Sequence, residues 1–241
     1  MAFENWRGSV GIIKPTLRPG SMEDLIRLLP DGIGVVITHI NIRTGTQKEF
    51  NEVIPHYEER VAELAAAEVE VIHPAGAPPF FLLGYKGEQE LLREWEKKYR
   101  TPIFTNGTNQ VAALKALGIK SFVGASYFPG EINKSYAQYF QEAGFDVRAM
   151  EGMNVEFNKV QNMSSREVYG FIRKLFLKHQ DVDGIYMLGS GWRTLDIVEM
   201  MESDWGIPVV HHIPAQSWEI QKRLRVRQPM KGFGRLLAEM P

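Results

Sequence analysis

Short apolar runs alternate with segments of helical periodicity along the whole chain. The runs are continuous and rich in β-branched residues, as in buried strands. The segments between them repeat apolar residues every three or four positions, as in amphipathic helices. Predicted strands are residues 9–14, 33–38, 69–73, 102–105, 121–125, 146–150, 184–188 and 208–210. Predicted helices are residues 22–29, 49–67, 87–99, 108–117, 131–143, 164–179, 194–204 and 215–224. This alternation predicts an α/β fold in which helices flank mostly parallel sheets.

The series of strands and helices runs through the chain twice, which predicts two α/β lobes. We expect the first lobe to comprise residues 1–104 plus 212–241, and the second to comprise residues 105–211. Ligands of open parallel sheets bind beyond the carboxyl ends of the strands. The predicted active site therefore lies in the cleft between the lobes.

Composition narrows the class of protein. The chain has 241 residues, 44% hydrophobic and 24% charged, which is typical of a packed globular protein. A net charge of −1 with interspersed signs argues against nucleic acid as a partner. No apolar run approaches the ~20 residues that span a bilayer, and the first residues contain no signal-peptide core, so we expect no membrane association and a cytoplasmic location. The absence of cysteine excludes disulfides, thiolate metal sites and cysteine nucleophiles.

Four of the six histidines follow predicted strands: His39, His73, His211 and His212. Histidine transfers protons near neutral pH and binds metals, so these residues are candidate acids or bases. For each one, a local hydrogen bond at the start of a loop is the alternative. None of these four histidines has a His-x-x-x-His or His-x-Glu spacing, so we predict no metal site. Neighbouring strand residues face opposite ways, so at most one of His211 and His212 enters a given cleft.

The glycine-rich turn at Gly189, Ser190 and Gly191 follows a predicted strand and precedes a predicted helix. Glycines let the backbone approach a ligand, and a helix N-terminus favours an anion, so this turn is a predicted small-anion site. Ser190 is a candidate for substrate contact. It is not a predicted nucleophile, because Gly-Ser-Gly is not the Gly-x-Ser-x-Gly elbow.

Further candidates lie at other strand ends. Tyr127 follows a strand, where its phenol can donate a hydrogen bond to a developing oxyanion; an ordinary half-buried tyrosine is the alternative. Asn106 lies in the predicted N-cap segment directly before the helix over 108–117, whose N-terminus can face an anion. Lys14 and Arg43 are the cations closest to the predicted cleft and are candidate carboxylate ligands.

Several segments resemble the aspartate/glutamate racemase superfamily, in particular the branch of arylmalonate decarboxylase and maleate cis–trans isomerase. The segments that carry the resemblance are GSGWRTLD at 189–196, WGIPVVHHIPAQSW at 205–218, GFGRL at 232–236, AALKALGI at 112–119 and ASY at 125–127. The resemblance implies two pseudo-symmetric lobes with the active site between them, no cofactor and no metal. It also implies a small carboxylate substrate and a homodimer as one possible assembly.

The resemblance implies chemistry that this chain can perform only in part. Racemases and the isomerase use two cysteines, one per lobe, and the decarboxylase keeps the second as proton donor. The matching positions are Gly76 and Gly189. The oxyanion-hole hydroxyls of the decarboxylase match Ala77 and Pro78, whereas its tyrosine matches Tyr127.

We therefore expect a cofactor-independent, decarboxylase-like lyase that acts on a small carboxylate through an enolate-type intermediate. Histidine would replace the thiols, with His73 preferred and with His39 and His211 as further catalytic candidates. Tyr127 and backbone N–H groups near Gly76 and Ser190 would stabilise the intermediate, and Ala77 is a further candidate for substrate binding. Aromatic residues that could line the pocket are Phe80, Phe81 and Trp192. The alternatives are a histidine-based hydrolase or hydratase with or without a metal, an isomerase of a small dicarboxylate, and a non-catalytic ligand-binding protein.

Overall fold

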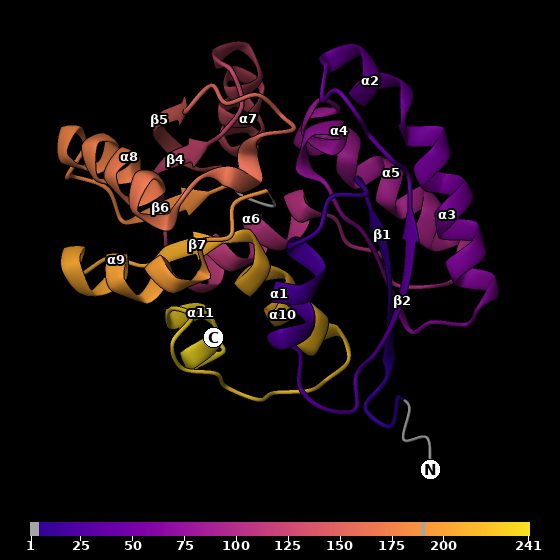
Figure 1. The fold of residues 1–241 in the computed structure, drawn as a ribbon. Coiled ribbons are helices and arrows are strands. Elements are labelled where there is room, and N and C mark those ends of the chain that lie inside the picture. Colours follow the sequence, from indigo (N-terminus) through magenta and orange to yellow (C-terminus); the bar gives the residue numbers. More distant parts are fainter. Residues whose placement is uncertain (1–4, 189–190) are drawn as a thin grey trace.

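The computed structural model, which describes residues 5–188 and 191–241, contains two parallel sheets (Figure 1). The first has the strand order β2-β1-β3 and the second the order β5-β4-β6-β7, and all paired strands are parallel. The strands are β1 (Ser9–Lys14), β2 (Gly34–His39), β3 (Val71–Pro74), β4 (Ser121–Ser126), β5 (Asp146–Gly152), β6 (Gly184–Met187) and β7 (Val209–His211). The prediction of an α/β fold with parallel sheets flanked by helices is confirmed.

Helices pack on both sheets. Helix α3 contacts all three strands of the first sheet, and α7, α8 and α9 pack on β5, β4 and β7 of the second. The helices are α1 (Ser21–Arg27), α2 (Gln47–Glu52), α3 (Ile54–Ala66), α4 (Ala77–Phe81), α5 (Gly84–Tyr99), α6 (Asn106–Ala116), α7 (Gly130–Glu142), α8 (Ser165–Lys178), α9 (Val198–Trp205), α10 (His212–Arg223) and α11 (Arg235–Glu239), with short 3-10 turns η1 (Val160–Asn162) and η2 (Leu195–Ile197). Among the described residues, no helix is long and apolar enough to cross a membrane.

Proline explains two differences from the predicted elements. The expected single helix over 49–67 is two helices, because Pro55, the second residue of α3, has no backbone N–H to donate to the preceding turn. The expected strand over 102–105 forms only one isolated bridge, between Ile72 and Ile103, and Pro102 contributes a carbonyl but no N–H. Helix α4 is a finding that the sequence pattern did not predict.

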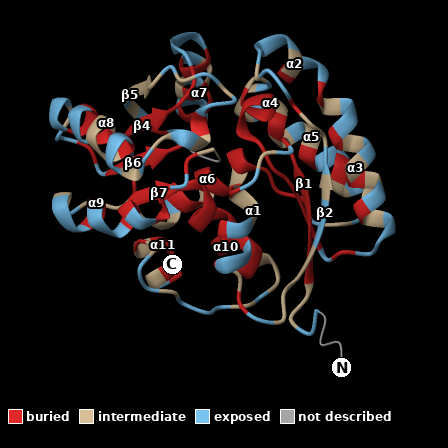
Figure 2. Ribbon diagram, in the orientation of Figure 1, coloured by how far each residue is buried: buried red, intermediate tan, exposed pale blue. Residues whose placement is uncertain are grey.

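The burial of a strand depends on its position in the sheet. Every residue of β1, β3 and β6 is buried, as expected of strands covered on both faces. Strand β2 lies at the edge of its sheet and is partly exposed, with Val36 and Ile37 facing solvent (Figure 2). Helix α10 begins directly after β7 and contacts α1 and α6, so it links the second sheet to elements near the first. The exact lobe boundaries at 104/105 and 211/212 stay a prediction.

Candidate functional site

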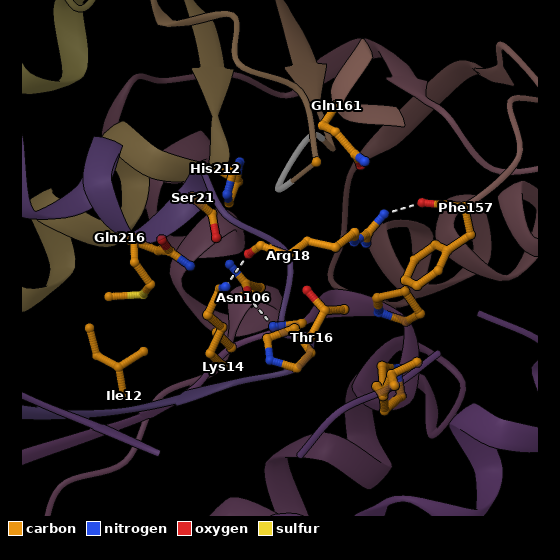
Figure 3. Close-up of a pocket in the computed structure, with 18 of the residues that line it drawn as sticks. Ile12, Lys14, Thr16, Arg18, Ser21, Asn106, Phe157, Gln161, His212 and Gln216 are labelled. Atoms are coloured by element: carbon orange, nitrogen blue, oxygen red, sulfur yellow. Dashed lines mark hydrogen bonds between the residues drawn. The ribbon is translucent and has the colours of Figure 1, made fainter. Parts of the chain in front are cut away.

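A cavity lies beyond the carboxyl ends of strands from both sheets. The volume that the centre of a water molecule can occupy in it is about 50 Å³. One water needs only ~10–15 Å³ by the same measure, so the cavity has room for a small ligand. The lining residues come from the β1–α1 loop, the segment after β3, the N-termini of α6 and α10, and loops of the second lobe (Figure 3). They are Ile12, Lys14, Pro15, Thr16, Arg18, Pro19, Ser21, Met22, Leu25, Ile42, Phe50, Ala75, Gly76, Pro78, Pro79, Asn106, Tyr127, Phe128, Phe157, Gln161, Gly191, His212 and Gln216.

The cavity is positively charged. Lys14 and Arg18 line it, and no aspartate or glutamate does so in the part of the chain that the structure describes. Lys14 ends β1, is 6% exposed and donates a hydrogen bond to the Arg18 carbonyl. Arg18 donates to the Phe157 carbonyl, and its guanidinium carbon lies 4.0 Å from the centre of the Phe157 ring. Neither cation forms an ion pair with a described carboxylate, although buried lysines are normally paired. The site therefore favours an anion.

Asn106 presents a hydrogen-bond donor to the cavity from the N-terminus of α6. Thr105 caps this helix by accepting a hydrogen bond from the Thr108 N–H, which places Asn106 in the first turn. The Asn106 Oδ1 accepts a hydrogen bond of 2.7 Å from the Gly76 N–H. The Asn106 Nδ2 is buried and has no partner among the described residues. This amide therefore holds the loop after β3 and keeps a donor for a ligand, whereas the Gly76 N–H is already in use.

His212 presents an imidazole without hydrogen-bond partners. It is the first residue of α10, is 1% exposed and lines the cavity. Neither ring nitrogen has a partner in the described part of the chain. Burial holds the pKa of His212 well below its ordinary value, and the rings of His211 and His73 add to the effect. The N-terminus of α10 also disfavours a positive ring. The ring is therefore neutral at pH 7 and offers one donor and one acceptor.

His73 lies behind the cavity wall and reaches the cavity through Gln216. Its Nδ1 is 2.9 Å from the Phe104 carbonyl, which only accepts hydrogen bonds, so Nδ1 carries the proton. Its Nε2 then accepts a hydrogen bond of 2.9 Å from the Gln216 amide. Burial lowers the pKa of His73 to about 4, and its ring stacks on Phe104 with 4.3 Å between ring centres. Neutral His73 thus fixes the Gln216 amide and leaves the Gln216 Oε1 as an acceptor for the cavity.

The structure brings together five of the twelve predicted site residues: Lys14, Gly76, Asn106, Tyr127 and Gly191. The others either lie outside the lining or outside the described residues. His39 and Arg43 are exposed, and His73, Ala77 and His211 are buried, while Gly189 and Ser190 are outside the described residues. The catalytic and binding roles expected of all these residues stay predictions.

Local structure explains the positions of His39 and His211. His39 ends β2, and the edge position of that strand exposes the histidine to solvent. His211 accepts a hydrogen bond of 3.2 Å from the Ile213 N–H and thereby caps α10, and its other ring nitrogen lies 3.2 Å from the Thr194 hydroxyl. Of the adjacent pair His211 and His212, only His212 lines the cavity.

Different aromatic residues line the cavity from those expected. Phe80 and Phe81 lie in the core on α4, where Phe81 stacks on Tyr139. Trp192 is buried and contacts the edge of Tyr127, with 5.5 Å between ring centres, so it supports a lining residue. The aromatic lining is formed by Phe50, Phe128 and Phe157.

The backbone at Gly76 does not suit a side chain. Its φ is 108°, a conformation that residues with a Cβ rarely adopt. A Cβ at Gly76 would also lie 2.8 Å from the Tyr57 hydroxyl, which donates a hydrogen bond of 2.6 Å to the Ala75 carbonyl. The local fold is therefore adapted to glycine at this position.

Sequence reasoning missed five residues of the lining that carry polar groups: Thr16, Arg18, Ser21, Gln161 and Gln216. Arg18 lies in the same strand-to-helix loop as Lys14, four residues later, and a search for cations after the first strand would have found it. Gln216 lies four residues after His212 and therefore on the same face of α10. The predicted start of that helix at residue 215 concealed this relationship.

No group of three or more histidine, aspartate or glutamate side chains is placed to hold a metal ion within residues 5–188 and 191–241. Two of the three buried histidines use their ring nitrogens in contacts with the protein. His73 bonds to Gln216 and Phe104, and His211 caps its own helix.

Comparison with known proteins identifies relatives over nearly the whole chain. The family model of arylmalonate decarboxylase matches residues 10–237. The arylmalonate decarboxylase of Bordetella bronchiseptica is 22% identical over 233 residues, which are 96% of this chain and 97% of the relative.

Solved structures share the fold. The maleate isomerase Iso of Pseudomonas putida S16 has a TM-score of 0.90 at 19% identity, covering 97% of this chain and 99% of the other. The maleate cis–trans isomerase of Nocardia farcinica has a TM-score of 0.88 at 20% identity, covering 96% and 98%. The Pseudomonas enzyme has been solved with maleate, and the Nocardia enzyme with a covalently bound succinylcysteine intermediate. This chain has no cysteine with which to form that intermediate.

Proposed function

Because the chain belongs to the arylmalonate decarboxylase family, we propose that it is a cofactor-independent lyase that decarboxylates a small carboxylate through an enolate-type anion. The observation that carries the proposal is the combination of charge and unpaired polar groups in one cavity. Lys14 and Arg18 line it without a described carboxylate, and Asn106 and His212 face it with buried atoms that have no described partner. An anionic substrate with several oxygen atoms would satisfy all four.

Arg18 is the proposed ligand of the substrate carboxylate. Its guanidinium has five N–H donors, of which one is used by the Phe157 carbonyl among the described contacts. The remaining donors suit a carboxylate, which Arg binds with two parallel hydrogen bonds. The Asn106 Nδ2 and the N-termini of α6 and α10 add to the anion affinity.

Tyr127 and the Arg18 guanidinium are proposed to stabilise the anion that remains when carbon dioxide leaves. Tyr127 is 3% exposed and lines the cavity, and its ring contacts the rings of Trp192 and Phe128. A phenol held in this way can donate a hydrogen bond to developing negative charge with little reorganisation.

His212 is the proposed proton carrier, in place of the His73 preferred from the sequence. In the free protein its ring is neutral, because burial depresses its pKa. A carboxylate bound nearby raises the pKa of a histidine, so substrate would bind together with a proton. That proton passes to the carbon that loses the carboxylate. The balance is complete: one carboxylate and one proton enter, and the protonated product and carbon dioxide leave.

The test is carbon dioxide release from a panel of small carboxylates, including substituted malonates and 3-oxo carboxylates. We expect turnover of at least one compound by the wild type, with solvent deuterium incorporated at the product carbon in D₂O. His212→Asn and Arg18→Gln should each lower kcat/KM at least about tenfold, equivalent to ~1.4 kcal/mol. The matched controls His56→Asn and Arg166→Gln, at exposed positions of α3 and α8, should leave it unchanged. Equal rates in all four variants would refute the assignment.

A second candidate is a carboxylate-binding protein without catalytic activity. The observation that favours it is the absence of cysteine from a chain whose relatives include an enzyme with a succinylcysteine intermediate. Ligand-induced stabilisation by carboxylates without product formation from any of them would select this candidate. A homodimer and a cytoplasmic location also remain predictions.

A further inference from the structure

Lys14 has an environment unlike that of an ordinary surface lysine. It is the last residue of β1, the central strand of the first sheet, and it is 6% exposed (Figure 3). Lys14 lines the cavity, and its Nζ donates one hydrogen bond, to the Arg18 carbonyl. An ammonium group has three N–H donors, whereas a neutral amine has two and a lone pair. A single protein acceptor among the described residues therefore suits the amine better than the ammonium ion.

The charges around Lys14 favour the same state. Burial is the largest effect and lowers the pKa of Lys14, and the Arg18 guanidinium lowers it further. The exposed Glu23 raises it, but this carboxylate accepts a hydrogen bond from the Gly20 N–H and forms no ion pair with Lys14. His39 is paired with Lys14 in the sheet register. Partial desolvation and the charge of Lys14 lower the pKa of His39, so this histidine adds no positive charge near neutral pH. Burial and a neighbouring cation are the two features that activate lysine amines as nucleophiles.

The loop after β3 has few donors for an enolate oxygen. Ala77 and Pro78 carry no hydroxyl, and the Gly76 N–H is bonded to Asn106. An enolate beside this loop would therefore depend on neutral donors elsewhere in the lining, on Thr16, Ser21, Asn106 and Tyr127, and on the charge of Arg18. An iminium nitrogen would accept the electrons of the breaking bond directly, without an oxyanion hole.

We propose that Lys14 is a nucleophile whose amine forms a Schiff base with the ketone of a 3-oxo carboxylate. The inference rests on the lyase reaction proposed above and names its substrate class and its electron acceptor. The Lys14 nitrogen attacks the ketone carbon, the ketone oxygen leaves as water, and a protonated imine forms. The bond to the carboxylate then breaks, carbon dioxide leaves, and the electron pair moves to the nitrogen to give an enamine, the nitrogen analogue of an enolate.

The remaining steps restore the enzyme. A proton, from His212 in the proposed reaction, adds to the enamine carbon, and water hydrolyses the imine to the ketone product and the free amine. One 3-oxo carboxylate and one proton are consumed, and one ketone and one carbon dioxide are formed. Arg18 is placed to hold the carboxylate while the neighbouring Lys14 reacts with the ketone, because both residues line the cavity and the Lys14 Nζ is bonded to the Arg18 carbonyl.

The experiment is reductive trapping. The wild-type protein is incubated with acetoacetate, and separately with acetone and cyanoborohydride near neutral pH, then reduced, digested and analysed by mass spectrometry. We expect an isopropyl group on Lys14 in both reactions, at a level far above that of every other lysine. Lys14→Arg and Lys14→Met should lose the adduct and the turnover of acetoacetate, while the control Lys120→Arg, at an exposed position, should keep both. Circular dichroism checks that each variant is folded.

The outcomes separate the two proposals. Selective labelling of Lys14 by acetone without carbon dioxide release from any carboxylate would support the Schiff base and refute the lyase. Carbon dioxide release with no adduct on Lys14, together with turnover retained in Lys14→Arg, would overturn the inference and identify Lys14 as a positive charge that binds substrate. Labelling of Lys14 no greater than that of exposed lysines, in the wild type itself, would also overturn it.

Discussion

The buried carboxyl group of Glu88 should make the stability of the protein depend on pH in a direction opposite to that of its buried histidines. Glu88 lies on α5, is fully buried and accepts hydrogen bonds from the hydroxyls of Thr105 and Tyr139. Burial raises the pKa of Glu88 from 4.5 to about 7, although both hydrogen bonds oppose the change. Thr105 caps α6, so this carboxyl group supports the helix that carries Asn106 into the cavity.

The magnitude follows from linkage. The folded state binds the Glu88 proton more tightly than the unfolded chain, so its contribution is present below pH 4.5 and is lost as the pH rises through 7. The difference of 7 − 4.5 = 2.5 in pKa corresponds to a loss of about 3 kcal/mol, at ~1.4 kcal/mol for each tenfold change in proton affinity. Glu88→Gln keeps the shape of the protonated side chain and cannot ionise.

The assay is urea unfolding of the wild type and Glu88→Gln from about pH 5 to about pH 8.5. We expect the free energy of unfolding of the variant to rise relative to that of the wild type by about 2–3 kcal/mol across this range. His73 and His211, with pKa values lowered by burial to about 4 and about 3, destabilise both proteins as the pH falls below 6.5, and this effect cancels in the difference. Glu90→Gln, at an exposed position of α5, is the control and should show no such trend. Parallel wild-type and Glu88→Gln profiles would refute the burial argument.

Three other changes test the site itself. Tyr127→Phe keeps the ring contacts with Trp192 and removes the hydroxyl donor, so kcat should fall at least about tenfold in steady-state assays. An unchanged kcat would exclude a role for the phenol. Carboxylate binding should tighten as the pH falls, because the bound anion raises the depressed pKa of His212. Calorimetry in buffers of different ionisation enthalpy should detect proton uptake on binding, and His212→Asn should abolish that uptake. A Kd independent of pH would contradict this prediction. Asn106→Ala leaves the buried Gly76 N–H without its acceptor and should lower the free energy of unfolding in urea by about 1–3 kcal/mol. The control Asn158→Ala, at an exposed position, should lower it by less than about 0.5 kcal/mol. Equal losses in the two variants would show that the Gly76 contact adds no stability.

The fold was predictable because strand and helix periodicities are local. The runs that became β1 and β6 are continuous and apolar, and both strands are buried along their whole length. The parallel arrangement followed from the alternation of strands with helices. Errors occurred where one residue decides the outcome, as at Pro55, which lies in the first turn of α3 and divides the predicted helix in two.

The site was predictable only in part. Lys14, Asn106 and Tyr127 follow strands or begin helices, and the rule that ligands bind at carboxyl ends of strands placed them correctly near the cavity. The same rule applied equally to His39 and His73, which the structure places on an exposed strand edge and behind the cavity wall. The rule locates a region of the sheet, but it contains no information on strand order or on the direction of a side chain.

The amino-acid sequence alone determined the two-series α/β architecture, the absence of thiol chemistry and the set of polar residues at the strand ends, because these depend on residue type and on spacing along the chain. The tertiary structure decided which of those residues share one cavity. It placed Lys14 beside Arg18 without a described carboxylate and turned His212, not His211, into the cavity. It also buried Glu88 beneath the cap of α6. The physical reason is that charge state and hydrogen-bond satisfaction depend on distances between segments far apart in sequence, which only packing fixes.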